Sequence, residues 1–395
     1  MKVATLQHNT TFVVFVVLFL SCQRQQDSIP CLDVRRTYTQ KEIFLTDIAE
    51  VRYLILNSDN EDYLYSGTIR ATTENSVVVA DAMSGDILFF SKEGVPKSRF
   101  NHRGNGPKEY RNALNVIFDE KKNEVFVSQS VGSRILAYSS TGEYQREIPL
   151  PQGTRMGSFA SFDDDSFFFY DPTLESNRYG LDYDDIQSND LISPFYLISK
   201  EDGRVLDNIA LPMTPIFLGI NHNGDRVPGF KTRLMKCPDG VLICNPESDT
   251  VFFYGKDRQI VPILHKIPLA KTTNPMTYIN NCIDIGNYQF IELYIVQAGE
   301  VYPGIFPTKH YFRDKRTGEF FLQKLLLQDF IGKDFIIGPT SGVRIDIDNS
   351  TFVFELDLLE LKEAYAQNRL DGKLKELVAT LKEDDNNVFV LARIK

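Results

Sequence analysis

One stretch of the sequence, residues 103–142, restricts the possible folds more than any other. It begins with the glycine-rich run Arg-Gly-Asn-Gly-Pro-Lys-Glu-Tyr (103–110), passes through apolar runs at 125–127 and 134–138, and ends in a turn at Gly142. Short runs of β-branched and aromatic residues bounded by turn residues are typical of strands. The stretch therefore predicts one four-stranded antiparallel meander, and weaker copies of it recur along the chain.

The copies share a glycine turn. These turns fall at Gly94, Gly142, Gly203 and Gly318; the first two are 48 residues apart (142 − 94), and the wider gaps contain visible insertions. A repeat of roughly 40–50 residues with four strands in each unit is the signature of a β-propeller.

The two ends of the repeat region supply a closing strand pair. The runs 386–393 and 51–56 are largely apolar, and neither has a strand partner in its own neighbourhood. Pairing them in one blade would tie the ring shut and cover two sheet edges that otherwise invite aggregation. We therefore predict an all-β fold, a six-bladed β-propeller over residues 43–395.

One segment departs from the strand pattern. Residues 358–382 carry apolar side chains at helical spacing, with Asp371-Gly372 in the middle. We expect a short helical insertion, in two pieces, that decorates the last blade.

The meander resembles an NHL-type repeat, through Gly104, Gly106-Pro107, Glu109-Tyr110 and the turn at Gly142. The layout as a whole resembles the six-bladed β-propeller lipoproteins of the Bacteroidetes, from roughly residue 44 to the end of the chain. The resemblance implies the fold and a place in the cell envelope. It implies no ligand or activity, because a fold alone does not define a function.

The N-terminal residues have a different character. The apolar run Phe12–Leu20 is too short to span a hydrocarbon layer of roughly 30 Å and suits the core of a secretory signal. Ser21-Cys22 after it resembles a bacterial lipoprotein cleavage site. We predict a signal peptide at 1–21, lipid attachment at Cys22 and a polar tether at 22–42, which would make the protein an outer membrane lipoprotein, periplasmic or surface-exposed. A plain secreted protein is the alternative.

The net charge argues against a nucleic-acid partner. The chain carries 43 Lys and Arg against 53 Asp and Glu, a net charge of −10, whereas binding to nucleic-acid phosphates requires a basic face. We therefore expect no nucleic-acid partner.

The cysteines after residue 22 show no zinc-ligand spacing. They are Cys31, Cys237, Cys244 and Cys282. A tight turn with Asp239-Gly240 at its tip would set Cys237 opposite Leu242, so we favour buried free thiols over a Cys237–Cys244 disulfide.

Two regions offer candidate binding residues. Arg103, Lys108 and Tyr110 flank the glycine-rich turn and could line the mouth of a pocket. The insertion at 170–195 places aromatic rings among carboxylates, a composition suited to a sugar or a peptide. Its candidate residues are Tyr179, Asp182, Tyr183 and Asp184. A blade-to-blade turn with positive φ and a solvated loop are the plainer interpretations of the two regions.

Signals for catalysis are weaker. His102, His222 and His310 lie at different places in their repeats, so we interpret them as isolated surface residues rather than axial metal ligands. Side chains at strand ends that could surround an axial divalent ion are Asp81, Asp163, Asp171, Asn245, Glu292 and Asp346.

The chain contains no Gly-x-Ser-x-Gly elbow. We assign no catalytic residue, metal or cofactor. The predicted function is a membrane-anchored module that binds a glycan, a peptide or a protein. A metal-dependent propeller enzyme, similar to a lactonase or a lyase, is the alternative.

Overall fold

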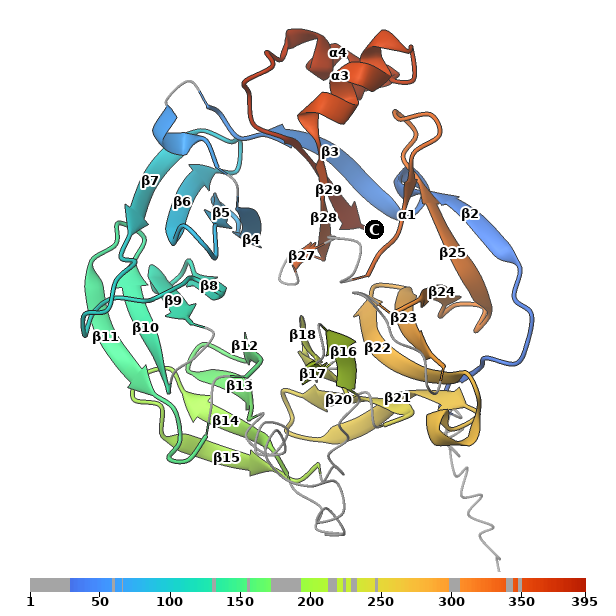
Figure 1. The fold of residues 1–395 in the computed structure, drawn as a ribbon, viewed down its shortest axis with the longest axis horizontal. Helices are drawn as coiled ribbons and strands as arrows, with labels where there is room; N and C mark the ends of the chain where they lie inside the picture. The colour runs from blue at the N-terminus through green and yellow to red at the C-terminus, as the bar shows by residue number, and fades with distance from the viewer. Residues whose placement is uncertain are drawn as a thin grey trace, which may run out of the picture.

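The computed structural model describes residues 29–58, 61–65, 67–129, 133–154, 157–171, 193–211, 219–222, 225–228, 233–245, 248–297, 306–338, 344–346 and 350–395. Of these, 219–222, 225–228, 271 and 344–346 are described by their backbone alone. Six sheets are arranged radially as the blades of a closed ring (Figure 1), which confirms the predicted six-bladed β-propeller.

Each blade has a core of four antiparallel strands, ordered from the central axis to the rim. Blade 1 contains β4 (Thr68–Thr72), β5 (Ser76–Ala80), β6 (Asp86–Ser91) and β7 (Pro96–Asn101). Blade 2 contains β8 (Asn115–Asp119), β9 (Glu124–Ser128), β10 (Arg134–Ser139) and β11 (Tyr144–Pro149). Blade 3 contains β12 (Phe159–Ser161), β13 (Ser166–Tyr170), β14 (Phe195–Ser199) and β15 (Val205–Ile209).

The second half of the ring follows the same plan. Blade 4 contains β18 (Arg233–Cys237), β19 (Gly240–Cys244), β20 (Thr250–Gly255) and β21 (Ile260–Ile267). Blade 5 contains β22 (Met276–Ile285), β23 (Tyr288–Val296), β24 (Thr308–Asp314) and β25 (Phe320–Leu326). Blade 6 contains β27 (Arg344–Asp346), β28 (Thr351–Leu356), β29 (Val388–Ile394) and β3 (Ala49–Ile55).

Blade 6 closes the ring with strands from both ends of the chain. β29 pairs antiparallel with β3, so that Val388 lies opposite Ile55 and Ile394 opposite Ala49. Residues 388, 390, 392 and 394 pack in a core shared with blade 5, whereas 389 and 391 pack toward blade 1. The predicted closure is confirmed, and both faces of β29 are apolar because the strand is enclosed between neighbouring blades.

The chain before β3 wraps around the rim of the propeller. β1 (Cys31–Asp33) adds to blade 4 by parallel pairing with β21, and β2 (Gln40–Phe44) adds to blade 5 by parallel pairing with β25. With β3 these strands cover the outer edges of three successive blades (Figure 1). Residues 31–33 and 40–42, which we expected in the polar tether at 22–42, therefore contribute to the sheets of the propeller.

The helical insertion lies between β28 and β29. It consists of α3 (Leu358–Ala366) and α4 (Gly372–Thr380), which begin after the capping residues Asp357 and Asp371. Each capping carboxylate accepts a hydrogen bond from a backbone amide at the start of its helix, which satisfies one of the otherwise unpaired N–H groups there. The helices pack on the segment that follows β25, in a core with Phe330 and Phe335.

The remaining short elements belong to connections. They are α1 (Leu45–Ile48), η1 (Glu61–Tyr63), β16 (Gly219–His222), β17 (Asp225–Pro228), η4 (Ala270–Thr272) and β26 (Asp334–Phe335).

The two faces of the ring carry connections of different length. Because each blade is an antiparallel meander, its second-to-third connection and the connection to the next blade emerge at one face, here called the loop face. The other turns emerge at the opposite face, here called the turn face. The loop face carries the long connections 171–194, 210–232 and 357–387, whereas no connection between described strands on the turn face is longer than 200–204.

Candidate functional site

The glycine-rich turn connects β7 to β8 on the loop face, and hydrogen bonds fix its backbone. Gly104 N donates to the carbonyl of Tyr110 (3.0 Å), and Tyr110 N donates to the carbonyl of His102 (3.1 Å). Gly106 N donates to the carboxylate of Glu109 (2.8 Å). Contrary to our expectation, neither Gly104 nor Gly106 has a positive φ. Glycine at 104 instead leaves room for the Glu109 carboxylate, which would meet a Cβ there at 1.9 Å.

Blade 2 holds the same turn from its other side. Arg134 Nη1 donates to the carbonyl of Pro107 (2.8 Å), and Tyr138 Oη donates to the carbonyl of Lys108 (2.8 Å). Arg111 N donates to Oε1 of Gln129 (3.0 Å). The turn therefore joins two blades, as its plainer interpretation predicted.

Tyr110 is a packing residue. It is fully buried, its hydroxyl donates to the carbonyl of Gly85 (2.7 Å), and its ring meets Tyr138 edge to face at 5.9 Å. Burial raises the pKa of Tyr110 to about 12. A ligand cannot reach this side chain without opening the contact between blades 1 and 2, so the structure does not place Tyr110 at a pocket mouth.

Arg103 and Lys108, in contrast, are exposed on the loop face. The ammonium group of Lys108 lies over the ring of Tyr144, 5.0 Å from its centroid. Arg111, which our sequence analysis did not select, is exposed one residue beyond Tyr110. The structure thus brings two of the three candidates at this turn together with a third cation.

A polar cluster lies inside blade 5, near the middle of its two inner strands. A bulge in β22 between Ile279 and Asn281 disturbs the regular pairing with β23 at Asn280. Glu292 on β23 is 1% exposed; its carboxylate accepts a hydrogen bond from Nδ2 of Asn280 and lies 3.1 Å from Nε2 of His310. Arg233, the first residue of β18, donates from Nε to Oδ1 of Asn280 (3.1 Å) and links the cluster to blade 4.

The chain after β26 closes this cluster. A Cβ at Gly338 would lie only 2.5 Å from Oε2 of Glu292, so the backbone approaches the carboxylate at a distance that suits glycine. A carboxylate beside an imidazole can hold or pass a proton. Here both carboxylate oxygens are engaged and the group is enclosed, so the cluster serves as a polar brace across blade 5.

Two histidines differ from our interpretation of them as isolated surface residues. His310 is mostly buried against Glu292. His102 stacks on Tyr138 with ring centroids 5.1 Å apart, and its Nε2 lies 2.6 Å from the carbonyl of Gly142. Their partners lie on other strands or in another blade, which sequence spacing alone did not reveal.

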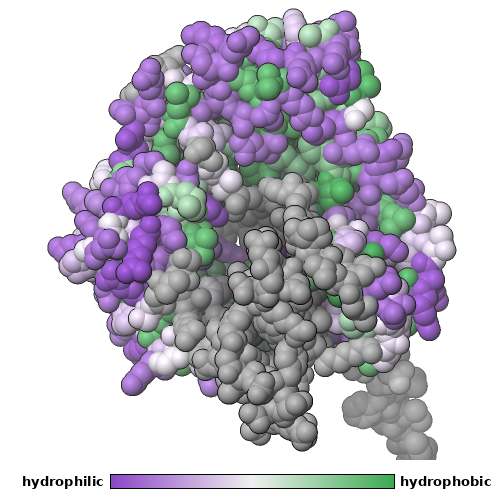
Figure 2. All heavy atoms as spheres, in the orientation of Figure 1, coloured by the Kyte–Doolittle hydropathy of each residue, from purple (hydrophilic) through white to green (hydrophobic). Residues whose placement is uncertain are grey.

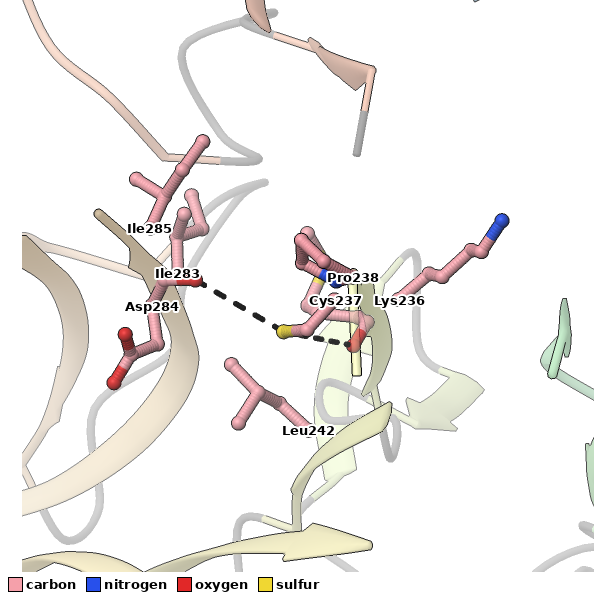
Figure 3. A pocket seen from close by; sticks show the side chains of 8 residues that line it. Lys236, Cys237, Pro238, Leu242, Ile283, Asp284 and Ile285 are labelled. Atoms are coloured by element: carbon pink, nitrogen blue, oxygen red, sulfur yellow. Dashed lines mark hydrogen bonds between the residues drawn. The ribbon is translucent and has the colours of Figure 1, made fainter. Parts of the chain in front are cut away.

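A small hollow lies between blades 4 and 5 near the turn face (Figure 3). Its lining consists of Met235, Lys236, Cys237, Pro238, Leu242, Ile283, Asp284 and Ile285. It has room for about one water molecule, so it does not form a site for a larger ligand. The thiol of Cys237 points into it toward the carbonyl of Asp284, with sulfur and oxygen 3.9 Å apart.

The four described cysteines are free thiols, as we favoured. The hairpin register is shifted from our expectation: Cys237 lies opposite Gly240, not Leu242, and Cys244 lies opposite Arg233. Burial raises the pKa of both Cys237 and Cys244 to about 12. Neither is therefore poised as a nucleophile.

The candidate metal ligands whose side chains the structure describes do not come together at one place. Asp81 and Asp163 accept hydrogen bonds from backbone amides of their own turns. No three His, Cys, Asp or Glu side chains of the described residues come together as metal ligands would. The side chain of Asp346 is outside the described residues, as are the candidates Tyr179, Asp182, Tyr183 and Asp184 and the predicted lipid site Cys22. No helix in the described part of the chain is long and apolar enough to cross a bilayer.

Comparison with known proteins defines the family. Residues 29–393 match the family called Domain of unknown function (DUF4934), and the chain belongs to it. No curated protein matches the sequence.

Comparison with solved structures gives matches at low sequence identity. A protein of Bacteroides fragilis NCTC 9343 described as exported is 17% identical with a TM-score of 0.61, over 93% of this chain and all of its own. A member of the DUF4221 family from Bacteroides vulgatus ATCC 8482 is 12% identical with a TM-score of 0.49, over 88% of this chain and 97% of its own.

Proposed function

We propose that this protein is a lipid-anchored β-propeller outside the cytoplasm that binds a glycan, a peptide or a protein on its loop face. The observation that carries the proposal is the unequal length of the connections on the two faces. Tight turns on one face add only what is needed to join strands. Connections such as 171–194 and 210–232 add far more chain than a join requires.

Long connections on a rigid scaffold are a common place for binding residues, because the scaffold positions them while the loops vary. The ring supplies that scaffold: its blades are joined by apolar cores and by a closing strand pair. The loop face carries the exposed cations Arg103 and Lys108, and the ends of β13 and β14 that the Tyr179- and Tyr183-containing segment joins also lie there.

The location is supported by two further observations. Residues 12–22 have the composition of a secretory signal that ends at a lipid-modified cysteine, Cys22. The structurally similar protein from Bacteroides fragilis is described as exported.

The test is a screen of glycan and peptide arrays with purified protein, followed by titration of any ligand found. Tyr179→Ala combined with Tyr183→Ala should weaken binding about tenfold or more, since each ring in contact with a ligand contributes on the order of 1 kcal/mol. The matched control is Phe44→Ala, which removes an exposed ring from β2 at the rim of blade 5, away from the loop face. A ligand bound equally well by both variants, and lost when turn-face lysines are substituted, would contradict the proposal.

A further inference from the structure

The connection between blades 1 and 2 carries exposed positive charge that no acid among the described residues neutralises. Residues 102–114 contain three Lys and Arg and one Glu, a balance of +2 (3 − 1), in a chain whose net charge is −10. Arg103, Lys108 and Arg111 are exposed, and no ion pair joins any of them to an acid within the described residues. Figure 2 shows strongly hydrophilic residues gathered at its left side, where Figure 1 places blades 1 and 2.

The acids beside these cations are already engaged. Asp86 accepts hydrogen bonds from Ser84 and Asn101. Glu147 pairs with Arg134 at 2.6 Å. The carboxylate of Glu109 is turned into the loop, where it accepts from Gly106 N. The three exposed cations therefore have no carboxylate partner among the described residues, although Lys108 also lies over the ring of Tyr144.

The cations are also held on a rigid backbone. Side chains of blade 2 and a bond within the turn fix the carbonyls of 107, 108 and 110, and Tyr110 anchors the turn in the core below. A preformed loop loses less conformational entropy on binding than a mobile one, which favours recognition.

Exposed apolar side chains flank the same connection. Met83 is 76% exposed on the turn between β5 and β6, and Leu114 is 40% exposed just before β8. The Met83 turn packs directly on the connection: Asn101 Nδ2 donates to the carbonyl of Ser84 (3.0 Å). Met and Arg are enriched at protein interfaces relative to the remaining surface.

We infer that Met83, Arg103, Lys108, Arg111 and Leu114 form a docking surface for an acidic segment of a partner protein. Carboxylates of the segment pair with the guanidinium and ammonium groups, and its apolar side chains cover Met83 and Leu114. A polysaccharide or a nucleic acid would use the cations but leave the two apolar side chains exposed. The inference rests on the proposed function in that it assigns a partner class to part of the loop face.

The experiment measures fluorescence anisotropy of a labelled peptide of four Glu-Glu-Leu repeats titrated with purified protein. The patch variant is Arg103→Glu, Lys108→Glu and Arg111→Glu. The matched control is Lys92→Glu, Lys121→Glu and Lys256→Glu, which makes the same change in net charge at exposed lysines on the turn face. Circular dichroism and thermal melting check that both variants are folded.

We expect the patch variant to lose about tenfold or more in affinity and the control to stay close to wild type. A peptide of Glu-Glu-Ser repeats should bind more weakly than the Leu peptide, and Met83→Ser with Leu114→Ser should remove that difference. A higher salt concentration should weaken the binding of both peptides, because salt screens the charge pairs.

Three results would overturn the inference: no binding of the Leu peptide by wild type, equal losses in the patch and control variants, or patch-dependent binding of polygalacturonate or DNA in preference to the peptide. If the patch variant still binds a loop-face ligand that depends on Tyr179 and Tyr183, the proposed function stands and only this inference fails. If no ligand of any class engages the loop face, both fail.

Discussion

Gly203 lies directly against Pro149, at a point where blade 3 meets the end of blade 2's outermost strand. A Cβ on Gly203 would sit 1.9 Å from the carbonyl oxygen of Pro149, and the residue also has a φ of 73°. Gly94 lies in the same way against Ile55, the last residue of β3. At Gly94 and Gly203 the glycine that marks the repeat in the sequence is therefore a contact point between successive blades, whereas the equivalent Gly318 has open space around it.

Gly203→Ala should lower the thermal midpoint clearly, because the new methyl group must displace backbone as well as accept a left-handed conformation. Gly318→Ala is the matched control: its φ is 77°, but nothing lies within 4 Å of the added Cβ. The control should show only the conformational cost, about 1–2 kcal/mol. Thermal melts of the two variants check this, and equal shifts would remove the contact argument.

The closing strand should contribute strongly to stability. Val390→Ala removes two methyl groups from a fully buried site in the core between blades 5 and 6 and should destabilise by about 1–3 kcal/mol. Arg393→Ala on the same strand changes an exposed side chain and should have little effect. Deleting 387–395 should cause aggregation or a large fall in the melting midpoint, because it unpairs both β28 and β3. A deletion variant that melts at the wild-type temperature would refute closure by β29.

The polar brace in blade 5 should contribute to the stability of the fold through the hydrogen bonds of Glu292. Glu292→Ala leaves Asn280 and His310 without their shared partner and should destabilise by about 1–3 kcal/mol. Glu292→Gln keeps the size and an acceptor oxygen, so it should lose much less. Chemical denaturation measures the difference. Equal stability of the two variants would argue that the hydrogen bonds to Glu292 contribute nothing to the fold.

The buried thiols should be unreactive in the folded protein. With its pKa raised to about 12, the Cys237 thiol is roughly one part in ten thousand thiolate at pH 8. The thiolate is the form that reacts, and the pKa of Cys237 lies well above pH 9. Raising the pH from 7 to 9 should therefore leave the Cys237 thiol almost unlabelled. In a Cys22→Ala background, a thiol reagent should count one cysteine in the native state, the exposed Cys31, and four after denaturation. Rapid native labelling of Cys237 or Cys244 would show that blades 4 and 5 open.

The blade pattern could be predicted because it depends on local chemistry. Turn glycines and alternating apolar runs mark each meander, and Asp371-Gly372 marks the start of α4. β1 was missed because three residues, Cys31–Asp33, carry no alternation; the strand exists only through its partner β21, more than two hundred residues away.

The contacts of the candidate site residues likewise depend on parts of the chain that are distant in the sequence. Glu292 and His310 meet across two strands separated by the connection 297–307, so neither residue signals the other in the sequence. Tyr110 was selected as a pocket residue from its neighbours in the glycine-rich run, but its direction is set by Gly85 and Tyr138 in two different blades. Burial of that kind follows from the three-dimensional register, which composition does not encode.

The lipid anchor gives the last prediction. Acyl chains contribute about 0.8 kcal/mol per buried CH₂, so two or more chains on Cys22 would hold the propeller firmly to a membrane. Cys22→Ala should therefore move the protein from the membrane pellet to the soluble fraction outside the cytoplasm. Cys31→Ala is the matched control, because it changes an exposed cysteine nine residues further on (31 − 22) and should leave the protein in the pellet. Fractionation with a carbonate wash measures both, and a Cys22→Ala protein that stays in the washed membranes would show that something other than this cysteine attaches it.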